Sequence, residues 1–392
     1  MARHFDPRRV LKEVSNRLLA EFFARRGGLP GVPWDELGET DIEPVFEAWQ
    51  KMPEAEHLEV QVILQDVNEL ADERGLNVLV EEICRRAPDR ADDLAALEGR
   101  HDKAMWAYLH APLAFDEAAL FARADALAAG RYWTKRNSLP KQEVKVNKAL
   151  RESLAGALTT FYWPAQMRGR HCHVEHYRRA NGAEYFFAYL DDYPDSHIVF
   201  DDAGRFEKRA DRYAFTNVFA YSPEEGALEL YAQGGRKIID PLQALFCKAV
   251  LDADVGPADP AKPAFRLDHL KDRGVPLPTD PEDRIAQVQV RDLRFEIVGS
   301  PRRRIRLEAD PQSFNGDIYQ MIDRYLNAEN LPLSKLRVIH AQVRLTFVQE
   351  GAGRAKGLTF NVGLHSSDLK SKPDEMRVIG ERCLRLWGVT HD

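Results

Sequence analysis

The hydrophobic residues of the first 160 positions recur with the spacing of amphipathic helices. Apolar side chains stand at every third or fourth position over residues 11–22, and Asp6-Pro7 before them is typical of a helix N-terminus. A second stripe over 63–70 predicts a helix that ends with Gly75 as its C-cap. Further helical spacing covers 77–86, 91–110, 115–128 and 146–160. The pattern therefore predicts an all-helical domain over residues 1–160.

Near residue 168 the helical spacing gives way to runs of aromatic and β-branched residues. Residues 170–179 and 184–190 flank Asn181-Gly182, and Asn-Gly is the strongest short signal for a β-hairpin. The strand over 184–190 is apolar on both faces, so we expect helices to cover both. Asp-rich stretches at 191–195 and 201–204 predict turns between further strands.

A helix over 241–251, with its apolar residues on one side, ends this β-rich region. We therefore predict an antiparallel β-rich domain over residues 168–251, with that helix covering one face of the sheet. Residues 252–283 then hold six prolines, which excludes a continuous helix or a central strand. This stretch is interpreted as a Pro-rich linker, with residues 265–270 docking on the protein surface.

The last part of the chain, residues 284–392, has the pattern of two ββα units. Strands over 288–298 and 305–307 form a first hairpin, and a helix with an apolar stripe follows. Alternating apolar residues over 343–347 and 358–364 predict a second hairpin. Pro373 and Gly388 bracket a final helix. A four-stranded sheet with two helices on one face is the simplest closure, so the whole chain is predicted to be a multidomain α+β protein.

The composition narrows the class of protein. A chain of 392 residues with 30% charged residues is typical of a soluble protein of two or three domains. No apolar run is long enough to cross a bilayer, and the N-terminal residues lack the apolar core of a secretory signal. The four cysteines are far apart, which argues against a disulfide scaffold or a zinc knuckle. We therefore expect a cytoplasmic protein without a membrane partner.

The net charge of −7 conceals an asymmetry along the chain. Residues 284–392 contain 18 Lys and Arg against 13 Asp and Glu, a balance of +5, so residues 1–283 carry −12. A basic end on an acidic chain favours an anionic partner for the C-terminal domain.

The densest positive run lies at the start of the C-terminal domain. In a strand, side chains at alternate positions share a face, and guanidinium groups bind phosphate with two parallel hydrogen bonds. The alternative is that the charges protect an edge strand from aggregation. The candidate nucleic-acid-binding residues of this run are Arg302, Arg303, Arg304 and Arg306.

Two other segments extend the candidate surface. A glycine-rich stretch carries Arg354 and Lys356; it lacks the Ser or Thr of a phosphate-binding loop and is predicted to be a hairpin loop. A basic loop interleaved with aromatic residues could bind nucleic acid by neutralising phosphates and stacking on bases. Alternatively, Trp133 fills a domain interface and the cations are solvated. The candidate residues of this loop are Tyr132, Trp133, Lys135 and Arg136.

A metal-binding hypothesis rests on His171, His173 and Glu175. These residues alternate, so in a strand they would project from one face and offer a divalent metal two imidazoles and a carboxylate. The alternative is a polar strand face, and the neighbouring arginines would repel a cation.

The chain has no Gly-x-Ser-x-Gly, His-Glu-x-x-His or Gly-x-Gly-x-x-Gly motif, and the leading hypothesis is a non-enzymatic protein. We expect it to bind nucleic acid or another anionic partner, as a component of a regulatory or defence complex. One alternative is a metal-dependent hydrolase or nuclease that uses the His/Glu cluster or an Asp cluster. The other is a scaffold that binds protein partners through its acidic helical region.

Overall fold

The computed structural model confirms the α+β class, with one five-stranded and one four-stranded antiparallel sheet. The structure describes residues 5–127, 133–179, 181–200, 204–259, 262–299, 303–310, 317–326, 329, 331–348, 357–369 and 372–390. The chain divides into two compact units, which are described in turn. The first unit contains Met1–Ala126, Arg179–Asn181 and Pro194–Arg212, and the second contains Leu127–Arg178, Gly182–Tyr193 and Tyr213–Asp392.

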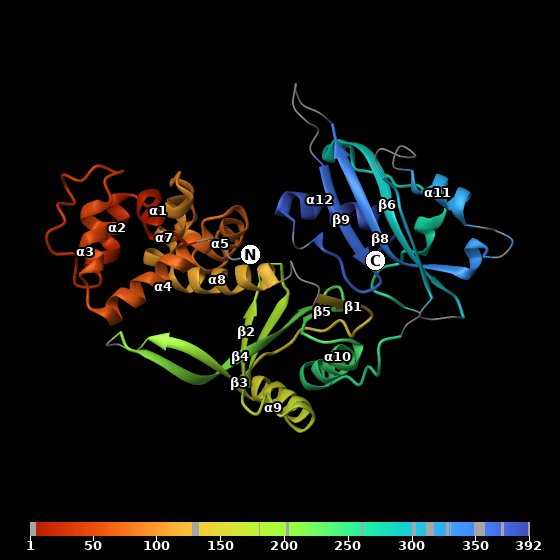
Figure 1. Cartoon of the computed structure of the whole chain (residues 1–392), viewed down its shortest axis with the longest axis horizontal. Helices are drawn as coiled ribbons and strands as arrows, with labels where there is room; N and C mark the ends of the chain where they lie inside the picture. The colour runs from red at the N-terminus through yellow and green to blue at the C-terminus, as the bar shows by residue number, and fades with distance from the viewer. Residues whose placement is uncertain are drawn as a thin grey trace. The chain divides into compact units, whose positions relative to one another are not determined.

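Helices build most of the first unit, as their apolar spacing predicts (Figure 1). Asp6 caps the first of them, where its side chain accepts a hydrogen bond from the Arg8 amide at 3.1 Å. The helices are α1 (Pro7–Glu13), α2 (Asn16–Ala24), α3 (Glu43–Gln50), α4 (Glu54–Leu70), α5 (Glu73–Arg86), α6 (Ala91–Ala95), α7 (Arg100–His110) and α8 (Pro112–Leu127), with a 3-10 turn at Pro88–Arg90.

Two local predictions in this unit need correction. The stripe over 11–22 belongs to two helices, because the chain is extended at Val14 and Ser15, and the Ser15 amide donates to Asp102 at 2.7 Å. Gly75 is not a C-cap but lies in the first turn of α5, where its amide donates to the capping Asp72. A Cβ at Gly75 would lie 2.6 Å from backbone atoms of Leu70, so glycine permits α4 and α5 to meet closely.

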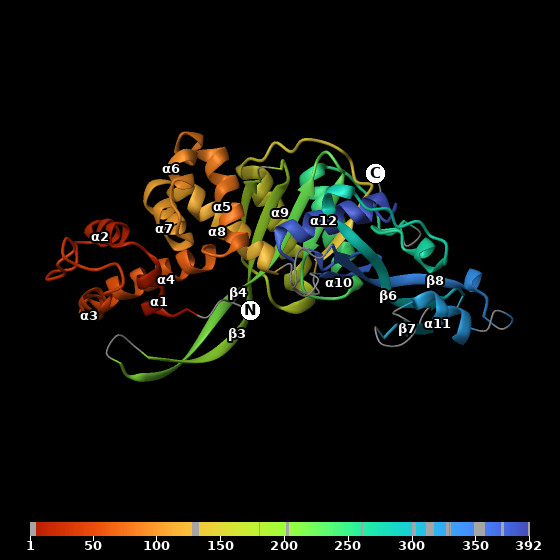
Figure 2. The same ribbon diagram turned by 90° about the horizontal axis from the view of Figure 1, so that it is seen from above.

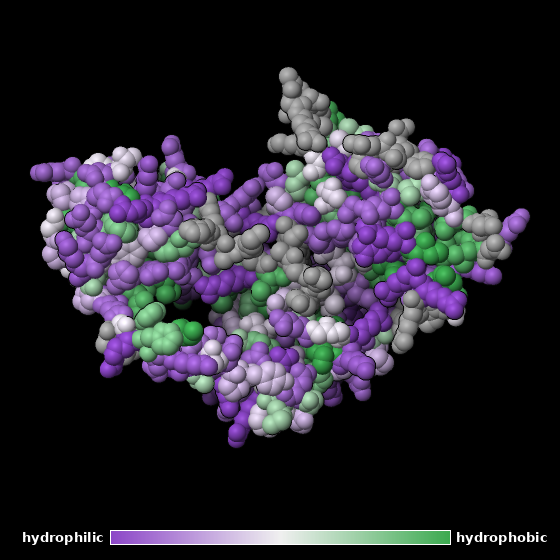
Figure 3. Space-filling model, in the orientation of Figure 1, coloured by the Kyte–Doolittle hydropathy of each residue, from purple (hydrophilic) through white to green (hydrophobic). Residues whose placement is uncertain are grey.

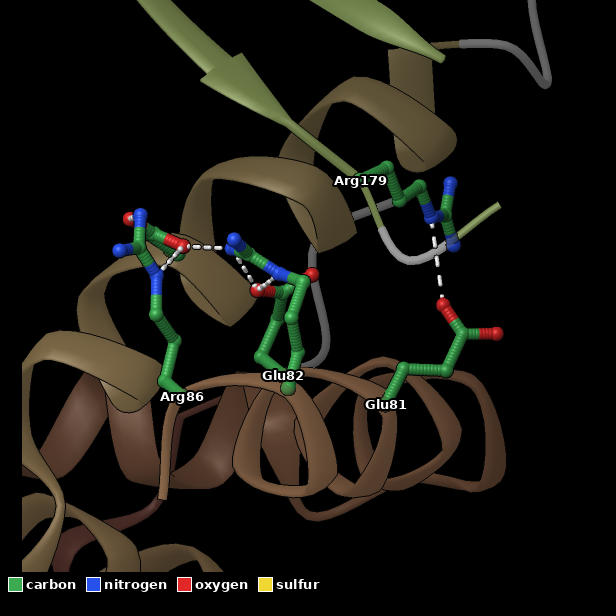
Figure 4. A network of polar contacts seen from close by, with 6 residues as sticks. Glu81, Glu82, Arg86 and Arg179 are labelled. Atoms are coloured by element: carbon green, nitrogen blue, oxygen red, sulfur yellow. Dashed lines mark hydrogen bonds and ion pairs between the residues drawn. The ribbon is translucent and has the colours of Figure 1, made fainter. Parts of the chain in front are cut away.

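A buried network of charged side chains joins α5 to α8. Glu82 is 0% exposed and accepts a hydrogen bond from Arg85 Nε at 2.9 Å. Arg85 also pairs with Glu117 on α8, and Arg86 donates to the same carboxylate (Figure 4). Burial raises the pKa of Glu82 above its ordinary value, while Arg85 opposes the rise. The network compensates charges that would be costly to bury alone.

Arg179 supplies a second set of buried charge contacts in the first unit. Its side chain donates to Glu81 at 3.3 Å (Figure 4). It also donates to Asp125 at 3.1 Å. The guanidinium also lies over the ring of Phe121, 5.6 Å from the ring centroid. A residue outside the helices is thereby bound to both α5 and α8.

The second unit contains most of the five-stranded sheet, with strand order β1-β5-β4-β3-β2, while the ends of β3 and β4 within Pro194–Arg212 belong to the first unit. The predicted hairpin is present, because Cys172 pairs with Leu190 and Arg178 with Glu184. The strand at the other edge, Trp133–Arg136, was expected to be a loop and instead pairs with β5. The strands are β1 (Trp133–Arg136), β2 (Cys172–Arg178), β3 (Glu184–Phe200), β4 (Phe206–Ser222) and β5 (Ala227–Tyr231).

Two helices, α9 (Lys148–Gln166) and α10 (Arg236–Leu251), pack against one face of this sheet. The shared core includes Leu158 of α9, Phe246 of α10 and Phe186 of β3. The predicted all-helical domain over residues 1–160 is therefore too long, since α9 belongs to the core of the sheet. The other face of β3 is also buried, as its apolar pattern predicts.

Strands β3 and β4 are longer than the sequence predicts, with 17 residues each. The Asp-rich stretch 191–195 was expected to be a turn and instead continues β3. Strand β2 pairs with β3 only as far as Leu190, so Pro194 lies beyond the ladder with β2, where proline is better tolerated. Figure 2 shows β3 and β4 side by side as a long ribbon, and the rings of Phe200 and Phe206 are 6.2 Å apart.

The C-terminal part of the second unit has the predicted ββαββα order, with sheet order β7-β6-β8-β9. Its core contains side chains from both helices together with alternate residues of the strands, so both helices pack on the apolar face of the sheet. The elements are β6 (Ile285–Ile297), β7 (Arg304–Glu308), α11 (Ile318–Tyr325), β8 (Leu336–Phe347), β9 (Gly357–Gly363) and α12 (Asp374–Leu386).

The Pro-rich stretch 252–283 packs against the C-terminal core. Phe265, Leu267 and Leu270 are buried within that core, in agreement with the predicted docking. Short 3-10 turns at Asp268–Lys271 and Pro281–Asp283 replace regular structure. Across the described residues of the chain, no helix is both long and apolar enough to cross a membrane.

Candidate anion-binding surface

The apolar residues of the C-terminal sheet alternate with polar residues, which form its second face. Across this face Glu296 of β6 stands between Arg304 of β7 and Arg337 of β8, and Gln289 pairs with Arg344. In Figure 1 helix α12 passes behind β8 and β9, and Figure 3 shows hydrophilic side chains gathered over these strands. The arginines at polar positions of β6, β7 and β8, hereafter the arginine face, are Arg291, Arg294, Arg304, Arg306, Arg337 and Arg344.

One buried carboxylate organises the middle of the arginine face. Asp292 is 1% exposed, and its Oδ2 accepts a hydrogen bond from Arg306 Nε at 2.5 Å. Arg294 Nε and His340 Nδ1 each lie 3.6 Å from Asp292 Oδ1. Burial acts to raise the pKa of Asp292, but the contacts with His340, Arg306 and Arg294 outweigh it and hold the pKa below its ordinary value. Asp292 is therefore an anion at neutral pH.

Other arginines of the face have no carboxylate partner within the described parts of the chain. Arg304 is exposed and Arg344 is half-buried, and neither forms an ion pair there. Arg291 donates to Gln289 at 3.3 Å, and burial together with the charge of Arg344 lowers its pKa below the ordinary value. Adjacent guanidinium groups without a counterion favour an anion from outside the chain.

The charge balance of the face is positive. Asp292, Glu296 and Glu308 are its acidic residues among those described, against the six arginines, which leaves an excess of three positive charges. Arg306 is largely neutralised, since it also pairs with Glu308 at 2.7 Å. The cations available to a ligand are therefore those at the two ends of the face, Arg304 and Arg344, rather than the one in the middle.

The structure tests only some of the predicted binding residues. Arg304 and Arg306 share a face of β7 as expected, and the exposed Arg303 precedes that strand. Four predicted residues, Arg302, Arg354, Lys356 and Tyr132, lie outside the described residues.

The basic aromatic segment does not offer the stacking surface that was expected. Trp133 is 7% exposed and its ring lies 5.8 Å from that of Tyr231, so it is not available to stack on a base. Lys135 pairs with Glu225 at 3.1 Å. Arg136 donates to backbone carbonyls of residues 255 and 256 at 3.0 and 3.1 Å. Trp133 is therefore buried, while its placement at a domain interface stays a prediction.

Sequence reasoning missed four members of the arginine face, Arg291, Arg294, Arg337 and Arg344. For Arg294 and Arg344 the signal was present in the period-two alternation, because they occupy polar positions between the apolar residues of the predicted strands over 288–298 and 343–347. Arg337 lies before the predicted second strand, because β8 begins at Leu336. Reading the polar half of each strand would have found Arg294 and Arg344. The register shift between Val290 and Asp292 hides Arg291 from such a reading.

The structure does not assemble the proposed metal triad. His171 precedes β2, which begins at Cys172, and its backbone amide donates to Asp191 at 2.7 Å. His173 has a 72% exposed side chain and lies 3.7 Å from Glu175. Over the described ranges, no three His, Cys, Asp or Glu side chains are grouped so that they could hold a metal ion.

Comparisons with known proteins leave the geometry as the only guide to function. No protein-family model matches the chain, and no curated protein and no solved structure matches it either.

Proposed function

We propose that the arginine face binds nucleic acid through its phosphate backbone, without reading the bases. The observation that carries the proposal is the pair of cations without carboxylate partners, Arg304 and Arg344, on a sheet face with an excess of three positive charges. Guanidinium groups bind phosphate oxygens in a bidentate geometry, and they remain charged at any physiological pH.

The arrangement of the strands suits an extended polyanion. Side chains two residues apart on β7, such as Arg304 and Arg306, are separated by about 6.8 Å along the strand. Neighbouring strands add further arginines at intervals of about 4.8 Å across the sheet. The polar positions of this face carry no Phe, Tyr or Trp among the described residues, and base stacking relies mainly on such rings. The imidazole of His340 lies beside Asp292 and is only 22% exposed. Binding is therefore expected to be insensitive to sequence, because phosphate contacts carry no sequence information.

Fluorescence anisotropy with a labelled 20-nucleotide DNA strand tests the proposal. The double variant Arg304→Ala/Arg344→Ala removes the two cations that carry it. Each phosphate contact contributes a slope of about −0.7 to the salt dependence for a single strand, or roughly eightfold in affinity at about 50 mM salt. We therefore expect binding to weaken by roughly 60-fold in the double variant.

A matched control separates the face from the general charge of the domain. Arg385 is exposed on α12, which packs on the apolar face of the sheet, and it forms no ion pair in the described part of the chain. Arg385→Ala is expected to leave affinity within twofold of wild type. Equal losses in both variants, or no binding by the wild-type protein at low salt, would refute the proposal.

A further inference from the structure

A cavity of about 440 Å³ lies in the second unit, away from the residues of the arginine face. Its walls come from β1 with the residues that follow it, from the first two turns of α10, from residues in 255–259 and 262–264, and from His365. This volume falls in the range of roughly 300–1,000 Å³ that is typical of small-molecule sites. Apolar atoms of Ile239, Val255 and Ala264 form part of the lining.

Cationic side chains converge on this cavity from three separate segments. Lys135 and Arg136 come from β1, Arg236 from α10, and Lys262 from the segment after it. Two acidic residues, Asp240 and Asp259, belong to the described lining. Lys135 is paired with Glu225 outside the lining, so the other three cations exceed these two carboxylates by one positive charge. The cavity is therefore suited to an anion.

Arg236 is held in place by a neutral histidine. Its Nη2 lies 2.7 Å from Nε2 of His365. Burial lowers the pKa of His365 below its ordinary value, and the charge of Arg236 lowers it further, so the imidazole is neutral and accepts this hydrogen bond. The contact orients the guanidinium and leaves its other N–H groups for a ligand.

The start of α10 adds backbone donors beside Arg236. Gly235 is the N-cap and lacks a side chain, so no side chain caps the first turn. The amides of Arg236 and Lys237 have no partner within the helix, whereas the Ile238 amide donates to the Gly235 carbonyl at 2.8 Å. The helix dipole favours negative charge at this end. Phosphate groups commonly bind where a glycine precedes a helix in this way.

The side-chain amide of Gln243, two turns along α10 from Arg236, offers a second kind of contact. Gln243 is only 3% exposed, yet it contributes to the lining. Its Nε2 donates weakly to Thr134 at 3.4 Å, and its carbonyl oxygen accepts no hydrogen bond from the residues that the structure describes. This oxygen can therefore accept a hydrogen bond from a ligand that carries a donor.

The separation between Arg236 and Gln243 sets the length of a ligand that contacts both. Seven residues of α-helix separate Arg236 from Gln243, which corresponds to about 10.5 Å along the axis. We propose that the cavity binds a nucleoside phosphate, with its phosphate between Arg236 and the first turn of α10. Its base lies against the apolar wall and donates to Gln243. This site is independent of the arginine face.

Gly235→Asp provides the sharpest test. Aspartate is among the best N-cap residues, Gly235 has φ −91°, and a Cβ there would meet nothing within 4 Å. The variant should therefore keep or raise the melting temperature. The added carboxylate would occupy and repel the phosphate position, so calorimetry with AMP, GMP, CMP and UMP should lose the binding seen with wild type.

Two further variants complete the experiment. Arg236→Ala should weaken nucleotide binding at least tenfold, while Lys237→Ala, in the same turn but outside the lining, should stay within twofold. The variant Arg304→Ala/Arg344→Ala should bind the nucleotide as wild type does. The proposal is overturned if none of the four nucleotides binds wild type at millimolar concentration. It is equally overturned if Gly235→Asp or Arg236→Ala binds as wild type does, or if the binding depends on Arg304 and Arg344.

Discussion

Asp292→Asn changes the charge of the arginine face without changing its shape. Asparagine has nearly the volume of aspartate, and the substitution removes the anion that engages Arg306 at 2.5 Å. The excess on the face rises from three positive charges to four, and Arg306 and Arg294 become available to phosphate. We expect nucleic-acid binding to tighten, by up to roughly eightfold at about 50 mM salt for each additional phosphate contact.

The same substitution should destabilise the fold. A hydrogen bond to a charged group contributes about 1.5–3 kcal/mol. The side chain of Arg306 is 51% exposed, so water can solvate it once Asp292 is neutral. No buried cation is left without compensation, and we expect the free energy of unfolding to fall by about 2 kcal/mol. Urea titration at pH 7 measures this change.

The pH dependence provides a separate check. The pKa of Asp292 is lower in the folded state than its ordinary value of 3.8, so its stabilisation is present above pH 3.8 and is lost as pH falls through the folded pKa. The difference in stability between wild type and Asp292→Asn should therefore shrink below pH 4. Asp323→Asn, which removes an exposed carboxylate paired with Arg273, should not tighten binding. Weaker or unchanged binding by a folded Asp292→Asn protein would refute the reasoning.

Three further predictions concern stability and reactivity. Arg179→Ala should lower the free energy of unfolding by about 2 kcal/mol in urea titration, because it leaves the partly buried carboxylate of Asp125 without its cation and removes the contact with Phe121. An unchanged midpoint would contradict the role of these contacts. Gly75→Ala gains up to about 1 kcal/mol in helix propensity, but its Cβ would meet the backbone of Leu70 at 2.6 Å. Thermal melting should therefore show that the free energy of unfolding falls by about 1–2 kcal/mol. A stabilised variant would show that α4 and α5 separate easily. Cys84 is exposed, whereas burial raises the pKa of Cys383 to about 12. Mass spectrometry after brief alkylation at pH 8 should therefore find Cys84 modified first. Faster reaction of Cys383 would contradict its burial.

The sequence predicts correctly those elements in which the pattern of apolar and polar residues shows which face is buried. The alternation over 343–347 and the stripe of α12 follow from one apolar face, so the ββαββα order could be predicted without knowledge of the neighbours. Strand β1 could not be predicted in this way, because its four residues show little alternation and form a strand only by pairing with β5. Residues 191–195 were misinterpreted because aspartate and proline are common in turns, although they are also tolerated at a strand edge.

The candidate site was predictable in part for similar reasons. The run that contains Arg304 and Arg306 stands out in the sequence, and their common face follows from strand geometry. The partner of Arg306 could not be predicted, because Asp292 comes from a neighbouring strand whose register shifts beside it. The burial of Trp133 depends on contact with Tyr231, which lies 98 positions later in the chain. Pairings of this kind are set by tertiary structure rather than by local pattern.

The salt dependence of nucleic-acid binding tests the proposed role of the arginine face most directly. The slope of log affinity against log salt counts phosphate contacts, and it can be measured for wild type and for Arg304→Ala/Arg344→Ala with the same single strand. The slope should become shallower by about 1.4 in the variant, which corresponds to two lost contacts at about 0.7 each. An identical slope in the two proteins would mean that neither arginine contacts phosphate.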